Sequence, residues 1–562
     1  MLLAATHTSV PGPDPAPELW TVETPDATRT FQILEQLGSG GFGRVYRARD
    51  LEHDRIVALK ALKLVNGDTL LSFKNEFRSL AGFSHPNLVA LHELLSGGGR
   101  WFFTMELVDG VDLLTHVTGA RALPFALHPT LDMRPPSPGA GCATNARTFD
   151  QARLRSTLRQ LAEGLHALHR AGKLHRDVKP SNILVTRDGQ VKLLDFGLVT
   201  AAGGGRTDGR VVGTAEYMAP EQGDGGRESP ATDWYSVGVM VYQALTGRLP
   251  HEGPWPQILL EKRTPPRPPS TLAWDAAPDL CELCARLLEP DPSRRPRGTE
   301  VLAALGGRAP VGARRRAFFD RRRPEPSALR RAFQACRERR TLRVIQVLGP
   351  RGAGKTALVE RFLSELRREH GGLVLSGRCS ARETLPFKAL DGVMDALCGH
   401  LCQLEADELA AVLPADAWTL PQLFPVFRAV RALEKLRRRQ QRVHTDPAAL
   451  RPLALRALRQ LLTRLAVRQP LALFIDDLQL GDPESLSALQ ALLHPPNPPA
   501  LLLVLSCRVA APPARVTVRA LDRLAAEEWP SIPAARDRAR RPCRQLLPAP
   551  SGLAAAPPVS VR

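Results

Sequence analysis

The sequence predicts two folded units, an α+β unit in two lobes followed by an α/β unit with a parallel sheet. Three observations support this. A chain of 562 residues is too long for one core. Short alternating runs come first, and long amphipathic helical patterns dominate from Thr148 onward. After an Arg-rich stretch that begins beyond Pro310, apolar strand patterns alternate with helical ones again.

The first lobe is predicted to be mainly β-structure. Residues 1–28 are rich in Pro, Thr and Asp without periodicity, so we expect disorder there. From Phe31 the runs FQILEQL, RVYRARD and IVALKAL predict successive strands, and a helix is expected around Leu71–Leu80. LVALHEL and WFFTMEL predict two further strands. A stretch rich in Pro, Gly and Ala at 118–147 predicts an inserted surface loop.

The net charge of +19 is concentrated in two arginine-rich stretches. Twelve Arg stand against three acidic residues between Gly312 and Arg343, and ten against four from Arg508 to the end. Such runs can bind nucleic acid, acidic lipid or an acidic protein. Because no helix-turn-helix, RRM or zinc module accompanies them, we expect a solvated linker at 304–324 and a disordered tail at 510–562. A nucleic-acid partner therefore ranks last.

The cysteines and the N-terminus indicate the cellular setting. The close pairs Cys281/Cys284 and Cys398/Cys402 have helical spacing in apolar segments, without the further ligands of a zinc site. We expect reduced core thiols, as in a cytosol. The N-terminus lacks the basic start of a signal peptide, and no stretch has the apolar length of a membrane span. The sequence thus predicts a soluble, cytoplasmic protein.

A glycine-rich turn and a lysine suggest a phosphate site in the first lobe. Gly38, Gly40 and Gly43 match G-x-G-x-x-G, which lets backbone NH groups approach phosphate oxygens. A strand rather than a helix follows, which argues against a dinucleotide fold. Lys60, in VALK, comes seventeen residues after Gly43 and can pair with α- and β-phosphates. Glu76 on the next helix is the natural carboxylate to hold it.

The segment LHRDVKPSN carries the strongest chemical signal. Asp177 can accept the proton of a substrate hydroxyl, Lys179 can neutralise a migrating phosphoryl group, and Asn182 can offer an oxygen to Mg²⁺. Thirteen residues after Asn182, Asp195 in LLDFG can bridge Mg²⁺ to the β- and γ-phosphates. This ordered set predicts phosphoryl transfer.

At these motifs residues 29–303 resemble a eukaryotic-type (Hanks-type) protein kinase domain, which implies a bilobal α+β kinase fold. D-x-K-P-x-N and GTAEYMAPE are similar to serine/threonine rather than tyrosine kinases. The resemblance implies Met105 as gatekeeper, with Glu106 and Leu107 as hinge contacts for adenine. The implied nucleotide-contacting set is Gly38, Ser39, Gly40, Gly41, Phe42, Gly43, Val45, Ala58, Lys60, Met105, Glu106, Leu107, Asn182, Leu184 and Asp195.

The same resemblance implies supporting residues outside the cleft. Asp233 in DWYSVGV would brace the catalytic loop, and Arg295 would pair with Glu221. Arg176 before Asp177 suggests control by phosphorylation of the activation loop, because an arginine can pair with the added phosphate. We expect Thr207 as the phosphosite and a structural role for Thr214.

The second unit contains a complete P-loop. In LRVIQVLGPRGAGKTALVERFL, a strand, a glycine loop and a helix follow one another, and Gly349, Gly354, Lys355 and Thr356 match G-x-x-x-x-G-K-[ST], with Gly352 in the same loop. Lys355 is expected on the β- and γ-phosphates and Thr356 on Mg²⁺.

An apolar strand, LALFID, predicts the carboxylates that complete this second site. Asp476 at its end would hold Mg²⁺ through water, and Asp477 could polarise the attacking water. Arg508 after the strand LLLVLSC could sense the γ-phosphate, although an arginine there is more often plain surface.

Residues 325–509 resemble the AAA/STAND-type signalling ATPases, notably in DDLQLGDPESL. A kinase joined to such a module looks like a class of large bacterial multidomain kinases. In that class a helical lid and a repeat sensor region usually follow, and neither pattern is seen after 509. We therefore expect an incomplete ATPase domain, a truncated or frame-shifted product, and oligomerisation through this module if it assembles as its relatives do.

The function predicted is an ATP- and Mg²⁺-dependent serine/threonine protein kinase in signal transduction, with a C-terminal nucleotide-binding regulatory module. The alternative is a non-catalytic scaffold in which both sites bind ATP and the output is conformation or assembly. Intact HRD, DFG and VALK motifs favour the enzyme.

Overall fold

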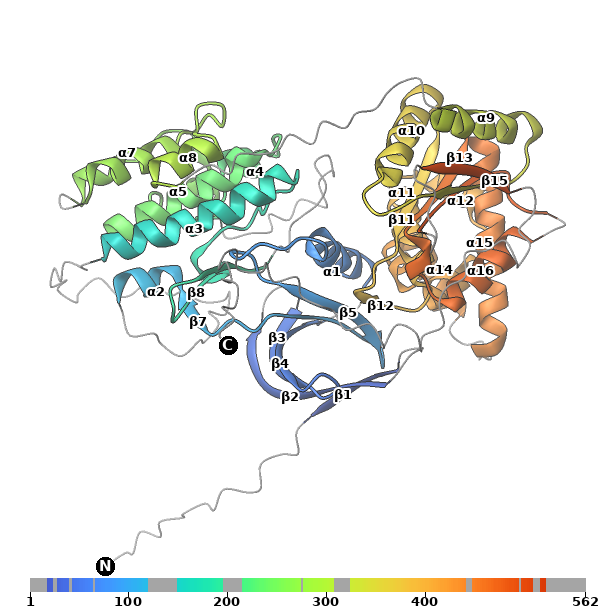
Figure 1. The fold of residues 1–562 in the computed structure, drawn as a ribbon, viewed down its shortest axis with the longest axis horizontal. Coiled ribbons are helices and arrows are strands. Elements are labelled where there is room, and N and C mark those ends of the chain that lie inside the picture. Colours follow the sequence, from blue (N-terminus) through green and yellow to red (C-terminus); the bar gives the residue numbers. More distant parts are fainter. Residues whose placement is uncertain are drawn as a thin grey trace, which may run out of the picture.

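The computed structural model describes residues 18–23, 28–39, 43–63, 66–119, 149–195, 215–273, 276–307, 324–440, 447–494, 497–508 and 516–521. These residues form a bilobal N-terminal part and a C-terminal α/β part (Figure 1). Helix α1 (Gly67–Leu80) lies between the first-lobe sheet and the α/β part. Because α1 carries Glu76, its surroundings on both sides bear on the predicted site.

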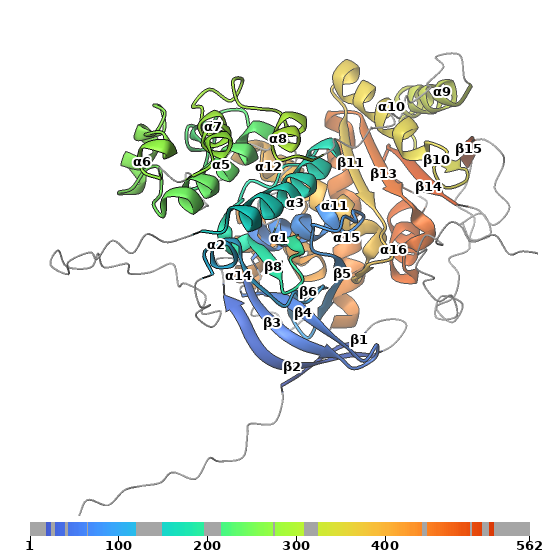
Figure 2. The ribbon, with the colours of Figure 1, turned by 60° about the vertical axis from the view of Figure 1, so that its left-hand side comes forward.

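The first lobe is a curved sheet with the strand order β1-β2-β3-β4-β6-β5-β12 (Figure 2). The alternating runs found in the sequence form these strands, since every second side chain reaches the interior. Phe31, Val57, Leu59 and Phe102 pack there in one apolar cluster. The strands are β1 Leu19–Glu23, β2 Thr28–Ser39, β3 Gly43–Asp50, β4 Arg55–Leu62, β5 Leu91–Gly97, β6 Arg100–Met105 and β12 Glu383–Thr384.

The prediction of disorder across residues 1–28 was wrong for Leu19–Glu23, which form β1 and pair antiparallel with β2. Trp20 is 6% exposed and Val22 1% exposed, because both side chains enter the apolar cluster of the first lobe. Burial of these two alternating apolar side chains thus favours a strand despite the Pro-rich composition around it. Residues 1–17 and 24–27 lie outside the described part.

The second lobe is mainly helical, with a small antiparallel sheet β7-β8-β9 at its boundary with the first. The amphipathic pattern after Thr148 forms α3, whose N-terminus is capped by the side chain of Asp150. The elements are β7 Gly110–Asp112, α2 Leu113–Thr118, α3 Gln151–Arg170, η1 Pro180–Asn182, β8 Ile183–Thr186, β9 Val191–Leu193, α4 Pro220–Gly223, α5 Pro230–Thr246, α6 Trp255–Glu261, η2 Pro269–Thr271, α7 Pro278–Leu287 and α8 Gly298–Ala304. The insert predicted at 118–147 falls almost entirely on 120–148, outside the described residues.

The α/β part has the strand order β11-β13-β14-β10-β15, and its first four strands are parallel, as predicted. Alternate side chains of β10 enter two different apolar clusters, so helices cover both faces. The elements are α9 Pro324–Arg339, β10 Arg343–Leu348, α10 Lys355–His370, β11 Leu373–Arg378, α11 Lys388–Leu401, α12 Ala406–Val412, η3 Ala415–Thr419, α13 Leu420–Leu423, η4 Pro425–Ala429, α14 Arg431–Gln440, α15 Pro447–Arg468, β13 Leu471–Asp476, η5 Leu478–Leu480, α16 Pro483–Leu493, β14 Leu502–Cys507 and β15 Thr517–Leu521.

β15 corrects the prediction of a disordered tail from residue 510. Thr517–Leu521 pair antiparallel with β10, with Thr517 opposite Leu348. The pattern TVRAL is short and stands in Pro- and Arg-rich sequence, so its edge pairing was not visible locally. Residues 509–515 and 522–562 are not among those described.

Two smaller findings concern cysteines and membranes. Cys281, Cys284 and Cys398 are buried thiols, whereas Cys402 is exposed, contrary to the prediction of a core thiol. Cys402 is the C-cap of α11, where the helix leaves the core. Among the described residues, no helix has the length and apolar character needed to cross a membrane.

Candidate active site

The predicted lysine of the first lobe bridges two carboxylates. Lys60 on β4 places Nζ 2.7 Å from Oε1 of Glu76 on α1 and 2.7 Å from Oδ1 of Asp195. Burial opposes the charge of Lys60, but Asp195 and Glu76 outweigh it, so its pKa lies above the ordinary value. Partial burial would raise the pKa of Asp195, but Lys60 holds it below its usual range. Strand, helix and loop therefore converge on one ammonium group.

The catalytic-loop residues predicted from LHRDVKPSN also lie together. Lys179 Nζ is 2.8 Å from Asp177 Oδ2, and Asn182 Nδ2 donates to the same oxygen at 3.0 Å. Asn182 donates as well to the carbonyl of Asp177 at 2.8 Å. With its Nδ2 used in this way, Asn182 keeps an amide oxygen as a hard ligand.

A buried carboxylate holds this loop in place. Asp233, fully buried on α5, accepts hydrogen bonds from the backbone NH groups of His175 (2.9 Å) and Arg176 (2.7 Å). His169 Nε2 lies 2.7 Å from the same carboxylate. Burial would raise the pKa of Asp233, yet these contacts, His169 first, keep it below its ordinary value. The ionised carboxylate thus fixes the backbone that leads into Asp177.

Backbone strain coincides with these residues. Arg176 has φ +70°, Asp195 φ +48° and Asp477 of the second site φ +54°. Non-glycine residues in this region cost on the order of 1 kcal/mol each and collect at functional sites. Arg176 also pairs with Glu228, its Nε 2.6 Å from Oε2.

The predicted supporting pair, Glu221 and Arg295, lies inside the helical lobe. The Arg295 nitrogens are 2.8 and 3.0 Å from the two carboxylate oxygens. Arg295 also stacks over the ring of Tyr235, 4.8 Å from its centroid. This bidentate pair ties the segment after the activation loop to the C-terminal end of the lobe.

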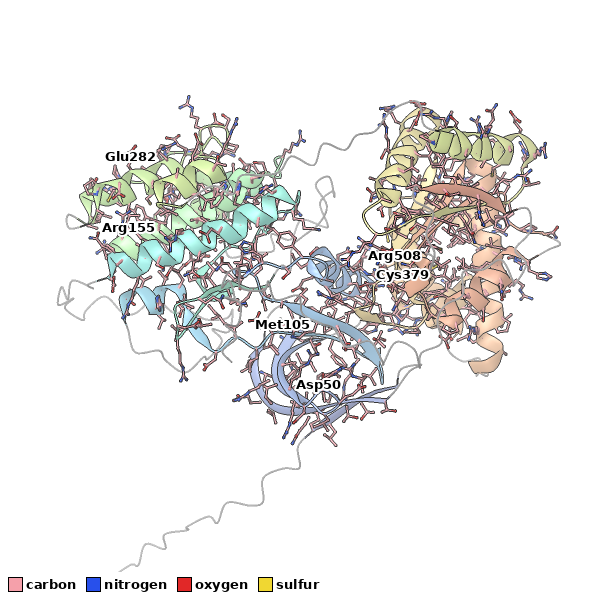
Figure 3. All side chains as sticks on the ribbon, viewed as in Figure 1. Asp50, Met105, Arg155, Glu282, Cys379 and Arg508 are labelled. Atoms are coloured by element: carbon pink, nitrogen blue, oxygen red, sulfur yellow. The ribbon has the colours of Figure 1, made fainter. Side chains whose placement is uncertain are left out.

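The residues expected around adenine lie on neighbouring strands. Ala58 is the cross-strand partner of Met105, and Val45 is the partner of Lys60. Met105 lies where β6 leaves the sheet toward the helical lobe (Figure 3). Leu184 is on β8, and Leu107 packs against the main core.

The hinge and the glycine loop add constraints. The NH of Glu106 donates to the carbonyl of Ala90 at 2.9 Å, so its carbonyl rather than its NH is the atom left for a ligand. Gly38 and Ser39 end β2, and Gly43 begins β3. A Cβ on Gly43 would lie 2.5 Å from the carbonyl oxygen of Ala61, so packing against β4 also requires glycine there.

Some predicted residues cannot be located. Gly40, Gly41 and Phe42 of the glycine loop lie outside the described residues. The same holds for Thr207, the predicted phosphosite, and for Thr214, so both predictions are untested.

The P-loop connects β10 to α10 in the α/β part. Gly352 (φ +78°) and Gly354 (φ +87°) adopt the left-handed backbone that favours glycine. Lys355 donates to the carbonyls of Gly349 (2.9 Å) and Pro350 (3.0 Å), within its own loop. Thr356 Oγ1 donates to Asp476 Oδ2 at 2.9 Å, which brings the P-loop and the end of β13 together.

The carboxylates at the end of β13 are held by Ser506 and Arg378, which the sequence analysis did not single out, and by Arg508, which it did. Ser506 donates to Asp476, and its Oγ accepts from the NH of Asp477 at 2.9 Å. Arg378 Nη2 is 3.2 Å from Asp477 Oδ2. Arg508 Nε is 3.3 Å from Asp477 Oδ1, and Figure 3 labels it beside Cys379.

Ser506, Arg378 and His169 were not identified from the sequence. Ser506 and Arg378 stand at the ends of strands next to β13, where parallel strands gather polar groups. Their position at these strand ends could have been used to predict that they belong to the site. His169, near the end of α3, offers no comparable pattern.

The donor set fits a magnesium ion. Asn182 and Asp195 would supply an amide and a carboxylate oxygen at the first site, and Thr356 and Asp476 would supply a hydroxyl and a carboxylate at the second. Across the described residues, no group of three or more His, Cys, Asp or Glu could hold a metal without further ligands. Phosphate oxygens of the nucleotide are the usual remaining ligands of Mg²⁺.

Comparison with known proteins agrees with this geometry. Residues 31–304 match the family described as protein kinase domain, and residues 319–505 match the AAA ATPase domain. Serine/threonine-protein kinase pkn2 of Myxococcus xanthus is 35% identical over 291 residues, which are 49% of this chain and 31% of that protein. PknL of Mycobacterium tuberculosis is 39% identical over 228 residues, 40% of this chain and 51% of that protein.

A third relative, the serine/threonine-protein kinase PknA of Mycobacterium tuberculosis, is 33% identical over 295 residues, 50% of this chain and 62% of that protein. The chain thus spans between 31% and 62% of the length of these relatives. It combines a domain of the protein kinase family, similar to those of bacterial serine/threonine kinases, with a domain of the AAA ATPase family.

Proposed function

We propose that the chain is a serine/threonine protein kinase that transfers the γ-phosphate of ATP to protein hydroxyls in signal transduction. The observation that carries this proposal is the pair of 2.7 Å contacts from Lys60 to Glu76 and Asp195. They join the phosphate-positioning lysine to the metal-holding carboxylate. A kinase needs the lysine–glutamate ion pair, and an aspartate placed to hold Mg²⁺, before it can align ATP.

In the proposed reaction Asp177 accepts the proton of a Ser or Thr hydroxyl. The hydroxyl oxygen bonds to the γ-phosphorus, and the bond from that phosphorus to the bridging oxygen of ADP breaks. Lys179, 2.8 Å from Asp177, neutralises charge on the migrating group. Mg²⁺ held by Asn182 and Asp195 would neutralise the phosphates.

The α/β part is proposed to bind a second nucleotide and regulate the kinase. Gly349 and Lys355 would hold phosphates, with Thr356 and Asp476 at the metal and Asp477 beside it. Oligomerisation through this part, cytoplasmic location and the absence of a nucleic-acid partner stay predictions from the sequence.

The test is radiolabelled phosphate transfer from ATP to a generic basic protein by the full chain, with Mg²⁺. Asp177→Asn keeps the shape of the side chain but removes the base, so transfer should fall about 10²- to 10⁴-fold. Asp188→Asn, a hairpin carboxylate of the same lobe that contacts Thr186, is the matched control and should change nothing. Label in phosphoserine or phosphothreonine identifies the acceptor.

Two outcomes would contradict the proposal. Full transfer by Asp177→Asn would remove Asp177 from its role. Nucleotide binding by the wild-type chain without any transfer would favour the scaffold instead. Lys355→Ala, run in parallel, should keep transfer measurable, since the second site is proposed to regulate rather than to catalyse.

A further inference from the structure

Five charged side chains meet where α1 contacts the α/β part. They are Lys74 and Arg78 of α1, Glu383 of β12, and Asp391 and Asp395 of α11. Lys74 is 1% exposed, with Nζ 2.9 Å from Asp391. Arg78 makes a bidentate contact with Glu383, at 3.0 and 2.8 Å. Buried charges of this kind hold a contact in one arrangement, because either partner alone is left uncompensated.

The backbone joins the two parts at the same place. β12 extends the first-lobe sheet by pairing parallel with β5, Glu383 opposite Leu94. The NH of Leu94 donates to the carbonyl of Arg382 at 2.9 Å. The guanidinium of Arg382 donates to the carbonyl of Ala81, the C-cap of α1, and to that of Leu91 at 3.1 Å. One end of α1 is therefore fixed by the α/β part.

The other end of α1 packs against η4. An added Cβ on Gly67 would lie 2.0 Å from the backbone nitrogen of Ala429 and 2.5 Å from the carbonyl oxygen of Val426. Apolar side chains also cross the boundary. Leu385 belongs to the main core of the bilobal part, and Leu71 of α1 packs against the core of the α/β part.

The geometry of α1 links these contacts to the active site. Residues four apart share one helix face, and residues two apart lie on nearly opposite faces. Lys74 and Arg78 therefore face the α/β part together, and Glu76, midway between them, points the other way to Lys60. A helix held on one face presents its opposite face in a fixed position.

We propose that the AAA ATPase domain is an intramolecular positioning partner of α1, which it clamps through the five charged side chains, β12 and η4 so that Glu76 reaches Lys60. The inference rests on the proposed kinase function and names the surface through which the second domain acts on it. Glu76 and the interface residues are positioning residues in this scheme.

The test uses the full chain and two independent ways of opening the contact. Asp391→Asn/Asp395→Asn removes two carboxylates at nearly constant volume. Gly67→Ala places a methyl group against η4, although alanine itself favours a helix. The matched controls are Asp416→Asn/Glu365→Gln, whose ion pairs with Arg456 and Arg330 are more exposed, and Gly399→Ala, where a Cβ meets nothing within 4 Å.

Two measurements are made on each variant. Backbone hydrogen exchange in α1 and β5 reports the contact itself. Steady-state phosphotransfer reports its effect, with kcat and the KM for ATP measured separately. We expect exchange in α1 and β5 at least about tenfold faster, and kcat/KM at least about fivefold lower with a raised KM for ATP, the low end of usual coupling between sites. The controls should match wild type in both.

Faster exchange with unchanged kinetics would overturn the inference and leave the kinase function standing. Unchanged exchange in both variants would show that the contact does not form in solution and would overturn it too. Absence of transfer by the wild-type chain would defeat the proposed function instead, and exchange would still report whether the domains dock. Should the double variant not fold, Gly67→Ala and Arg382→Met decide the matter, the latter removing only the guanidinium contacts to the carbonyls of Ala81 and Leu91.

Discussion

The two lysines predicted to bind phosphates are held in opposite ways. Lys60 contacts carboxylates that are 16 and 135 residues away in the sequence, on a helix and on a loop of the other lobe. Lys355 contacts two carbonyls of its own loop, the nearer in sequence only five residues away. Lys60 is therefore in place only when three separate elements converge. Lys355 is held by the local geometry of its own loop.

This difference indicates where regulation can act. A site assembled from distant elements responds to any contact that moves one of them, and α1 is such an element. The contacts of Lys355 lie within one loop and depend mainly on its glycines, here Gly352 and Gly354 with positive φ. The geometry around Lys60 can therefore respond to a regulatory contact on α1, whereas the geometry around Lys355 is set by the P-loop itself.

Replacing each lysine with methionine should give the largest difference between the two sites. Lys60→Met should lower phosphotransfer about a hundredfold to a thousandfold, because a preorganised charge at the phosphates is lost. Lys355→Met should change phosphotransfer by less than about tenfold, within the range of regulatory coupling. Calorimetric titration with Mg-ATP should find two sites in the wild-type chain and one in each variant. Equal inactivation by both changes would mean that the sites are not separate.

Glu76→Gln sharpens the comparison by removing one of the two partners of Lys60. Charge-assisted hydrogen bonds are worth about 1.5–3 kcal/mol, so kcat/KM should fall about tenfold to a hundredfold. The loss stays below that of Lys60→Met, since Asp195 still contacts the lysine. Glu93→Gln, on β5 and paired with Arg29 away from the cleft, serves as control in the same assay. A loss as large as that of Lys60→Met would mean that Asp195 cannot hold the lysine alone.

Ser506→Ala is the mildest of these changes and addresses the second site. Ser506 touches Asp476 and the backbone of Asp477, so its loss should weaken Mg-nucleotide binding at the P-loop about tenfold, as is usual for groups that orient metal ligands. Phosphotransfer by the kinase should stay within about twofold. The matched control is Ser364→Ala on α10. The Ser364 hydroxyl donates to the carbonyl of Glu360, in its own helix. Equal nucleotide affinity in both variants would remove Ser506 from the site.

The sequence predicted much of the fold because its signals were local. Alternating runs gave the strands around Phe31 and Lys60, and glycines before Lys355 gave the P-loop. Motif order and spacing also singled out Asp177 and Asn182, which contact each other, and Asp195, which contacts Lys60. Their proposed roles await the experiments above.

The missed features depend on contacts between distant segments. β12 is two residues long and pairs with β5 almost three hundred residues earlier, so no periodicity marks it. Lys74 and Arg78 look like ordinary solvent-facing charges until Asp391 and Asp395 are placed beside them. β1 and β15 were hidden by Pro- and Arg-rich surroundings, because composition averages over a window larger than a five-residue strand.

The pairing of β12 with β5 has a consequence for biosynthesis. Ribosomes add about 5–20 residues per second, so β5 leaves the exit tunnel roughly 15–60 s before its neighbour in the sheet exists. During that interval the edge of the first lobe has unpaired backbone groups and is open to wrong partners. The β5 edge of a nascent kinase domain would therefore be covered only as the last third of the chain is made. Under the clamp proposed above, the Lys60–Glu76 ion pair would also form only then.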